Sequence, residues 1–366
     1  MPALALIKHV FKAVAVDRNL CAAALRAVAR RFRFAAALLV VLASASAFAG
    51  DRNSDVISDP AYASAQRLVD IDHGRRLNLY CIGSGSPTIV FDAGLANWSQ
   101  IWGLVQPVVA ARTRACAYDR AGLGFSDPAT RPGTSANIVD DLHRLLRAAS
   151  IAPPYVLVGH SYGGMNVRLY ADLYRDDVAG LVLVDSSHED NMLSWLEMYP
   201  EPDVMTRFKA QRAEETREAQ ICIDGAKAGF IPGSESYLRC VSTGINTRYS
   251  PAINAVYYRL QQQPAFLQAR LWEDEAFDLD SPEQLRMARR SYGDLPMIVL
   301  TRAMSDGEDG APIDPSGWLH LQLHQDLAGL STRGEQRTVP HSTHDIHMDQ
   351  PQAVIDAIFD VLAAAR

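Results

Sequence analysis

The chain has 366 residues, of which 48% are hydrophobic and 21% are charged. This is the balance of an ordinary globular protein, and it excludes a disordered, collagen-like or coiled-coil chain. The net charge of −7 divides unevenly: residues 1–49 hold seven basic side chains and one acid, and the remainder holds 28 basic and 41 acidic residues, or −13. Because so acidic a surface repels phosphate backbones, we expect no nucleic-acid partner.

Residues 1–49 have the three parts of a secretory signal peptide. The basic stretch RRFR (residues 30–33) precedes a ten-residue apolar run (34–43), and small residues follow, ending in Ala-Phe-Ala (47–49). This order is typical of a signal peptide, and the apolar run is short for a bilayer span. We therefore expect a signal peptide over residues 1–49, a periplasmic or secreted protein, and no stable membrane anchor. A basic organelle transit peptide and a retained membrane anchor are the alternatives.

Four cysteines follow this leader: Cys81, Cys116, Cys222 and Cys240. An even number of cysteines in an exported chain favours two disulfides, because the compartment is oxidising. Four cysteines allow three pairings, among which the sequence alone does not choose. Four buried free thiols are the alternative.

From residue 67 onwards, β-like runs and helical patterns alternate, which predicts a mostly parallel sheet flanked by helices. Several of the runs are continuously apolar, as strands buried on both faces should be. The predicted strands cover residues 67–71, 76–82, 88–93, 114–119, 155–160, 179–185, 297–301 and 335–340. The predicted helices between them cover residues 99–111, 136–149, 164–174, 318–330 and 351–365.

One long interval, residues 188–293, does not continue this alternation of strand and helix patterns. It has no convincing strand, but it has helical patterns rich in Met, Trp and Tyr, such as residues 191–198 and 252–271. An insertion of this size after the sixth strand predicts a helical cap over a site, with residues 50–187 and 294–366 as the core. A subdomain that only stabilises the fold is the alternative.

The strongest chemical signal is a serine at the end of an apolar strand pattern, in the sequence VLVGHSYGG. Gly159, Ser161 and Gly163 match G-x-S-x-G, with His160 and Tyr162 between them, and a helical pattern follows. This is the context of a nucleophile elbow, a strained strand-to-helix turn at which flanking glycines leave room and the serine hydroxyl is exposed. We therefore expect Ser161 to be a nucleophile, and a plain turn is the alternative.

With these motifs the chain resembles the α/β-hydrolase superfamily over nearly all of residues 67–365. AYDRAGLGFSDP (117–128) is similar to the family's Asp-x-x-Gly-x-Gly-x-Ser segment after the fourth strand. FDAGLANWSQIW (91–102) is similar to the segment after the third strand, with Ala93 in place of the usual histidine. The resemblance implies the α/β-hydrolase fold, with eight mostly parallel strands flanked by helices and a mainly helical cap after the sixth.

The resemblance also implies an oxyanion hole made by the backbone N–H groups of Leu95 and Tyr162. Backbone donors tolerate the change at Ala93. Dehalogenases and epoxide hydrolases of this fold carry Asp at the elbow. The serine at this position therefore excludes their reactions as the predicted function. No metal or organic cofactor is implied.

A serine nucleophile needs a base, which in this family follows the acid in the chain. The C-terminal HSTHDIHMDQP is similar to the family's Ser-Gly-His-x-Ile pattern ending in Pro, which places the base at His344. His341 and His347 are then expected in the loop or at the surface. His320 and His324, at helical i, i+4 spacing, could join these histidines in a metal site, but no Glu or Cys accompanies them as in zinc patterns.

The acid has two candidate positions. The usual family position follows the seventh strand, where RAMSDGEDG offers Asp306 and Asp309, and Asp185 instead ends the sixth strand. We favour Asp185, with Asp306 as the alternative acid, because a rigid strand end holds the imidazole in one tautomer better than an acidic loop does. A strand-end residue that caps the next turn is the other interpretation of Asp185.

The family topology implies a disulfide pairing as well. The second and fourth strands are neighbours in the family's sheet, so Cys81 would pair with Cys116, and Cys222 with Cys240 in the cap.

The sequence thus predicts an exported serine hydrolase that cleaves carboxylic esters through an acyl-enzyme. A peptidase, thioesterase, lactonase or carbon–carbon bond hydrolase could use the same triad, and a non-catalytic binding protein on this scaffold is a different class. Cap aromatics and methionines favour a small-molecule ester with an apolar or aromatic group, although such residues are more often cap core: Trp195, Met198, Tyr257, Tyr258 and Trp272.

Overall fold

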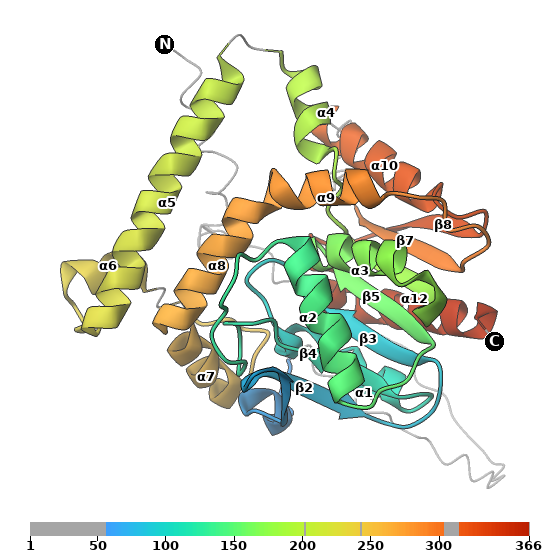
Figure 1. Cartoon of the computed structure of the whole chain (residues 1–366), viewed down its shortest axis with the longest axis horizontal. Coiled ribbons are helices and arrows are strands. Elements are labelled where there is room, and N and C mark those ends of the chain that lie inside the picture. The colour runs from blue at the N-terminus through green and yellow to red at the C-terminus, as the bar shows by residue number, and fades with distance from the viewer. Residues whose placement is uncertain (1–55, 201–202, 242–243, 304–314, 366) are drawn as a thin grey trace, which may run out of the picture. The chain divides into compact units, whose positions relative to one another are not determined.

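The structure of the protein is a computed structural model that describes residues 56–200, 203–241, 244–303 and 315–365 (Figure 1). The signal peptide expected over residues 1–49 lies outside the described residues, and so do Asp306 and Asp309. In the described ranges no helix combines the length and the apolar character that a membrane span requires.

An eight-stranded sheet forms the centre of the fold, in the order β1-β2-β4-β3-β5-β6-β7-β8. Strand β2 runs antiparallel to both of its neighbours, and the remaining pairs are parallel. This confirms the predicted sheet. The strands are β1 (Arg67–Asp72), β2 (Arg75–Ile82), β3 (Thr88–Asp92), β4 (Ala115–Tyr118), β5 (Tyr155–His160), β6 (Val178–Val184), β7 (Met297–Arg302) and β8 (Gly334–Val339).

Helices cover both faces of the sheet, which explains why its central strands are apolar throughout. Alternate residues of β5 face opposite layers: Leu157 belongs to the core shared with α2 (Ser135–Ala148) and α3 (Tyr162–Leu173). Val156 and Val158 belong to the core shared with α1 (Gln106–Ala110) and α12 (Pro351–Ala364). A strand that packs on both sides in this way cannot alternate polar and apolar residues.

Helical segments fill the interval between β6 and β7, as predicted for this part of the chain. We call them the inserted helices. They are α4 (Asn191–Met198), α5 (Val204–Ala228), α6 (Glu235–Cys240), α7 (Pro251–Gln261), α8 (Pro264–Phe277) and α9 (Asp280–Ala288). Helix α9 packs on α2 and α3 of the core (Figure 1). The role of this interval as a cap stays a prediction, and so do its boundaries.

Two predicted helices are each broken in two. The pattern over residues 99–111 is a 3-10 turn (Ser99–Trp102) followed by α1, with Gly103 between them. A Cβ at Gly103 would lie 2.4 Å from Ile57 Cγ2, so the glycine allows the chain before β1 to pack there. The pattern over residues 252–271 divides into α7 and α8 because Pro264 lacks an N–H and keeps Gln263 extended.

The segment around Ile57 joins the core to the inserted helices. Its N–H donates to the carbonyl of Arg248, and its carbonyl accepts the N–H of Ser250, which form an isolated bridge next to α7. The Ile57 side chain is 1% exposed and packs in a cluster with Tyr62 and Tyr249. The segment around Ile57 thus contacts both Gly103 in the core and the residues directly before α7.

The cysteines lie in two pairs at disulfide distance, in the predicted combinations. Cys81 on β2 and Cys116 on β4 are register partners with their Sγ atoms 2.10 Å apart. Cys222 on α5 and Cys240 on α6 have theirs 2.11 Å apart. One pair thus joins two strands of the sheet, and the other joins two inserted helices.

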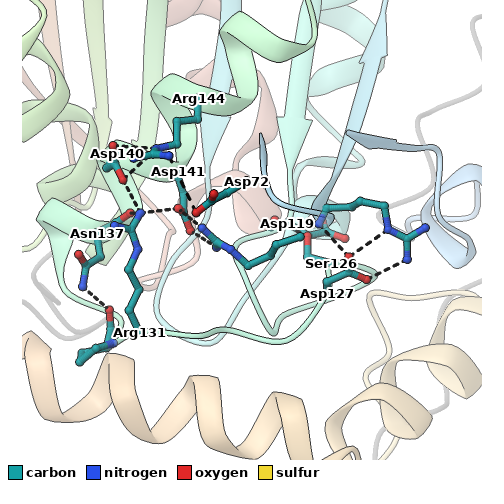
Figure 2. A network of polar contacts seen from close by, with 12 residues as sticks. Asp72, Asp119, Ser126, Asp127, Arg131, Asn137, Asp140, Asp141 and Arg144 are labelled. Atoms are coloured by element: carbon teal, nitrogen blue, oxygen red, sulfur yellow. Dashed lines mark hydrogen bonds and ion pairs between the residues drawn. The ribbon is translucent and has the colours of Figure 1, made fainter. Parts of the chain in front are cut away.

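An ion-pair network holds the loop between β4 and α2 against the sheet edge (Figure 2). Asp141 on α2 accepts both Arg75, at 2.6 and 2.7 Å, and Arg131, at 2.5 Å. Nearer the start of the loop, the Ser126 hydroxyl accepts the backbone N–H of Asn78 on β2 at 2.9 Å and donates to the carbonyl of Asp119 at 2.6 Å. The loop is therefore fixed at both ends, which matters because Arg120 lies in it.

Candidate active site

Ser161 occupies a sharp turn between β5 and α3. Its backbone has φ 53° and ψ −117°, outside the regions that non-glycine residues prefer. A Cβ on Gly159 would lie 2.4 Å from the carbonyl oxygen of Gly163, and one on Gly163 would lie 2.3 Å from the backbone of β3. Neither position has room for a side chain, so the glycines of the motif are explained by this tight turn.

The two N–H groups expected to form an oxyanion hole lie beside this turn. Tyr162 is the first residue of α3, where the N–H groups are unpaired and the helix dipole is positive. The loop with Leu95 passes the serine closely, because a Cβ on Gly94 would lie 3.4 Å from Ser161 Cβ and 2.8 Å from His160 Nδ1. Among the described residues, neither the Leu95 N–H nor the Tyr162 N–H has a hydrogen-bond acceptor.

His344 lies in the loop after β8 with its imidazole next to the turn. Its ring centroid is 4.6 Å from that of His160, and its backbone carbonyl lies 3.0 Å from His160 Nε2. Its Nδ1 lies 2.6 Å from Oδ2 of Asp185, the residue directly after β6. The structure therefore brings the elbow, His344 and Asp185 together, although 159 positions separate the last two in sequence.

The buried Asp185 carboxylate accepts hydrogen bonds from two residues besides His344, and the sequence predicts neither of them. His320 Nε2 lies 2.9 Å from Oδ1, and Arg302 donates from its backbone N–H at 3.0 Å and from its guanidinium at 2.5 Å. Burial alone would raise the pKa of Asp185, but the hydrogen bonds from His320 and His344 and the charge of Arg302 hold this pKa well below its usual range. Asp185 is thus an ionised group with fixed donors on both oxygens.

His347 is buried, so the prediction of a loop or surface position was wrong. It lies in α11 (Ile346–Asp349), is 1% exposed, and packs between the rings of Trp102 and His160, at 5.1 and 4.4 Å. Burial, and then the neighbouring His344, lowers the pKa of His160 to about 3. Burial also lowers the pKa of His347 well below its usual value. Both rings are therefore neutral at pH 7. His341 is exposed in a turn, as expected.

Two groups of side chains have the composition of a metal site, each with its donor atoms within 4.8 Å of one another. In the group of Asp185, His320 and His324, both ring nitrogens of His324 already have partners: Thr301 Oγ1 at 2.8 Å and the carbonyl of Ser186 at 2.9 Å. The second group is His160, Asp345 and His347. There, Nε2 of His160 already bonds the carbonyl of His344. Hydrogen bonding thus accounts for both nitrogens of His324, whereas Nδ1 of His160 and Nδ1 of His347 are buried without a partner among the described residues.

A buried ion-pair cluster beside the proposed oxyanion loop was not foreseen from the sequence. Arg120, Asp92 and Glu273 are each at most 3% exposed, and the guanidinium of Arg120 bonds both carboxylates. The motif that includes Arg120 was recognised, but Glu273 belongs to α8, 153 positions later. No local sequence pattern predicts an ion pair between residues so far apart in the chain.

A cavity of about 260 Å³ lies between the core and the inserted helices. Most of its lining is apolar: Met165, Met192, Trp195, Leu196, Phe208, Phe277 and Pro282. Its buried carboxylate, Glu189, is paired with Arg168 at 2.6 Å and Arg289 at 2.5 Å. Of the aromatics proposed from the sequence, Trp195 lines this cavity, whereas Tyr257 stacks on Trp98 at a ring distance of 5.2 Å.

The comparisons with known proteins agree with this architecture. The family model described as alpha/beta hydrolase fold matches residues 87–265. The uncharacterized protein YqjL of Bacillus subtilis (strain 168) is 24% identical over 77% of this chain and 86% of its own. Together with the strand order, these matches show that the chain has the alpha/beta hydrolase fold.

Solved structures share the fold at low identity. A thermophilic esterase from Thermogutta terrifontis is 21% identical, with a TM-score of 0.53, over 82% of this chain and 99% of its own. A putative epoxide hydrolase from Pseudomonas aeruginosa is 19% identical, with a TM-score of 0.58, over 82% of this chain and 96% of its own. The shared fold supports hydrolase activity on a small molecule.

Proposed function

We propose that this protein is a serine hydrolase that cleaves carboxylic esters, with Ser161 as nucleophile, His344 as base and Asp185 as acid. The observation that supports it most is a serine at a strained elbow beside an imidazole that a buried carboxylate holds at 2.6 Å. A base must itself be oriented by a third group to keep the correct tautomer, and Asp185 meets that need. This geometry favours Asp185 over Asp306.

The reaction proceeds in two halves. His344 takes the proton of the Ser161 hydroxyl through Nε2, because Nδ1 faces Asp185, and the serine oxygen attacks the ester carbonyl. The N–H groups of Leu95 and Tyr162 stabilise the oxyanion, and His344 then gives its proton to the departing alcohol. Water activated by His344 hydrolyses the acyl-enzyme by the same steps and releases the acid.

The residue at the elbow separates this function from that of some structural neighbours. The superfamily includes epoxide hydrolases, and members that open epoxides use a carboxylate at the elbow, as the resemblance implied. Here the elbow residue is Ser161. A serine attacks acyl carbon through an activated hydroxyl, so ester hydrolysis is the chemistry that fits this side chain.

The substrate has an apolar acyl or aromatic group. The cavity of about 260 Å³ supports this, because an apolar cavity of about 150 Å³ already admits benzene. The charge of Glu189 does not oppose an apolar guest, since two arginines neutralise it. The enzyme acts outside the cytoplasm, which the leader pattern and the two cysteine pairs support.

A fluorophosphonate probe tests this function directly. We expect the probe to label Ser161, identified by mass spectrometry of the modified peptide, and to leave a Ser161→Ala variant unlabelled. A series of p-nitrophenyl esters of increasing chain length then measures kcat/KM for the substrate class. A folded protein that neither reacts with the probe nor hydrolyses any ester would favour the non-catalytic binding protein.

A further inference from the structure

We propose that Arg120 and Glu273 are positioning residues that aim the Leu95 N–H into the oxyanion hole, so that an inserted helix completes the catalytic geometry of the core. The inference rests on the proposed ester hydrolase function. It assigns a role to the buried cluster that the triad does not use.

Arg120 bonds two consecutive carbonyls of the loop after β3. Its Nη1 donates to the carbonyl of Ala93 at 2.7 Å and to Oδ1 of Asp92 at 2.8 Å. Its Nη2 donates to the carbonyl of Gly94 at 2.7 Å. The guanidinium is planar and rigid, so these bonds set the direction of both carbonyls at once.

The bond to Gly94 also sets the direction of the next N–H. The carbonyl of Gly94 and the N–H of Leu95 belong to one peptide unit, which is planar and trans, so the two groups point in opposite directions. Holding the carbonyl towards Arg120 therefore turns the Leu95 N–H away from Arg120. A cation on the carbonyl also polarises the peptide, which makes its N–H a stronger donor.

Glu273 fixes the peptide unit on the other side of Leu95. Its Oε2 accepts the N–H of Ala96 at 2.8 Å, and Ala96 has a left-handed backbone with φ 56°. The same carboxylate accepts Arg120 Nε at 2.6 Å and Nη2 at 2.9 Å. One buried ion pair thus holds both peptide units that flank the Leu95 α-carbon.

Glu273 reaches this place from α8, so the orientation of the donor depends on how the inserted helices are seated. If α8 withdrew, Arg120 would lose one of its two carboxylates and the Ala96 N–H would lose its acceptor. The competing interpretation is a purely structural lock between α8 and the core. The two differ in whether stabilisation of an oxyanion changes when the bond is weakened.

The experiment compares Glu273→Gln with a control on the same helix, Glu275→Gln, whose carboxylate bonds the hydroxyl of Thr216 on α5 at 3.3 Å. Steady-state kinetics are measured with one p-nitrophenyl ester. Inhibition is measured with a trifluoromethyl ketone, which forms an oxyanion on Ser161, and with the matching secondary alcohol, which does not. Thermal unfolding shows that each variant is folded.

We expect Glu273→Gln to lower kcat by about tenfold or more, up to the loss of about 10²–10³-fold found when a whole donor is removed. KM and the inhibition constant of the alcohol should stay within about twofold of the wild type, while that of the ketone rises in parallel with the loss in kcat. Wild-type kinetics in Glu273→Gln, or equal losses for ketone and alcohol, would overturn the inference. Glu275→Gln should match the wild type throughout.

A second variant keeps the test decisive if Glu273→Gln does not fold. Glu273→Asp retains the charge in the buried pair but draws the carboxylate back from Ala96, and the same ratio of ketone to alcohol inhibition applies. Failure of both variants to fold would overturn the positioning role in favour of the structural lock. A wild-type protein that the fluorophosphonate does not label at Ser161 refutes the proposed function, whereas equal labelling rates in wild type and Glu273→Gln refute only this inference.

Discussion

His320 and His344 bond opposite oxygens of one carboxylate, at 2.9 Å to Oδ1 and 2.6 Å to Oδ2 of Asp185. A ring nitrogen that bonds an ionised carboxylate must donate, so each imidazole presents an N–H to Asp185. For His344 the other ring nitrogen is Nε2, which suits a base for Ser161. The arrangement makes Asp185 the centre of the site's hydrogen bonding.

Replacing Asp185 by Asn should lower kcat by about 10⁴-fold, because an amide in this place stabilises the wrong imidazole tautomer. The measurement is ester hydrolysis at pH 7, with circular dichroism to check the fold. Asp306→Asn is the matched control and should keep wild-type activity. If Asp185→Asn stays active and Asp306→Asn does not, the acid belongs to the segment after β7.

The stability of the protein should fall as the pH drops from 7 to 5, because buried histidines are neutral in the folded state. Burial, followed by the nearby His320, lowers the pKa of His324 to about 3, whereas its unfolded value is near 6.5. Below pH 6.5 the unfolded chain therefore binds a proton that the folded chain does not, so protons favour unfolding. At pH 5 this amounts to about 2 kcal/mol for one such histidine.

Urea unfolding of the wild type and of His324→Gln at both pH values measures this effect. The variant should lose less stability between pH 7 and pH 5, by about 2 kcal/mol. His73→Asn is the control, since the His73 side chain is 98% exposed, and it should keep the wild-type dependence. An unchanged dependence in His324→Gln would show that this histidine is already protonated in the folded protein.

Removing the Cys222–Cys240 pair should destabilise the protein by about 3 kcal/mol, since a bridge across a short loop limits the unfolded chain by that amount. The two cysteines are 18 positions apart. The Cys222→Ser, Cys240→Ser double variant is compared with the wild type by urea unfolding under oxidising conditions. Peptide mapping of the unreduced, exported protein should find both predicted links, and four free thiols would contradict the pairing.

Filling the cavity beside the inserted helices should shorten the acyl chain that the enzyme accepts. Met165 lines this cavity from α3, so Met165→Phe should lower kcat/KM for the longest accepted ester by about tenfold or more and leave the shortest ester little changed. Trp318→Ala, at an exposed position on α10 (Pro315–Ala328), is the control. An equal loss for all chain lengths would place the acyl group elsewhere.

Much of the fold could be predicted from the sequence because its signals are local. Strands such as β5 begin with a continuous apolar run and are buried at every position, and the glycines around Ser161 mark a turn without room for side chains. His344 followed from the resemblance of its loop to the family's Ser-Gly-His-x-Ile pattern ending in Pro. The partners of Asp185 are different, because His320 and Arg302 meet it only after the sheet has formed.

The errors have physical causes of the same kind. The prediction of an exposed His347 failed because the residues that bury it, Trp102 and His160, come from distant elements. The helix break at Gly103 depends on Ile57, some 46 positions earlier in the chain. The helix break at Pro264 has a local cause, the proline itself, but the helical periodicity on both sides of it predicted one continuous helix. Glu273 was missed because a lone acid in a helix is ordinarily solvated.

The contacts of Ile57 determine where a shortened recombinant form of the protein should begin. This residue bonds the backbone at Arg248 and Ser250 and fills the space above Gly103, so it fastens the start of α7 to the core. Recombinant protein that begins at β1 would lack these hydrogen bonds and this packing. We expect it to be less stable, so a lack of activity in it would not show that the catalytic residues are wrong. Production of the protein without the proposed signal peptide should therefore retain the residues between the end of that peptide and Ile57.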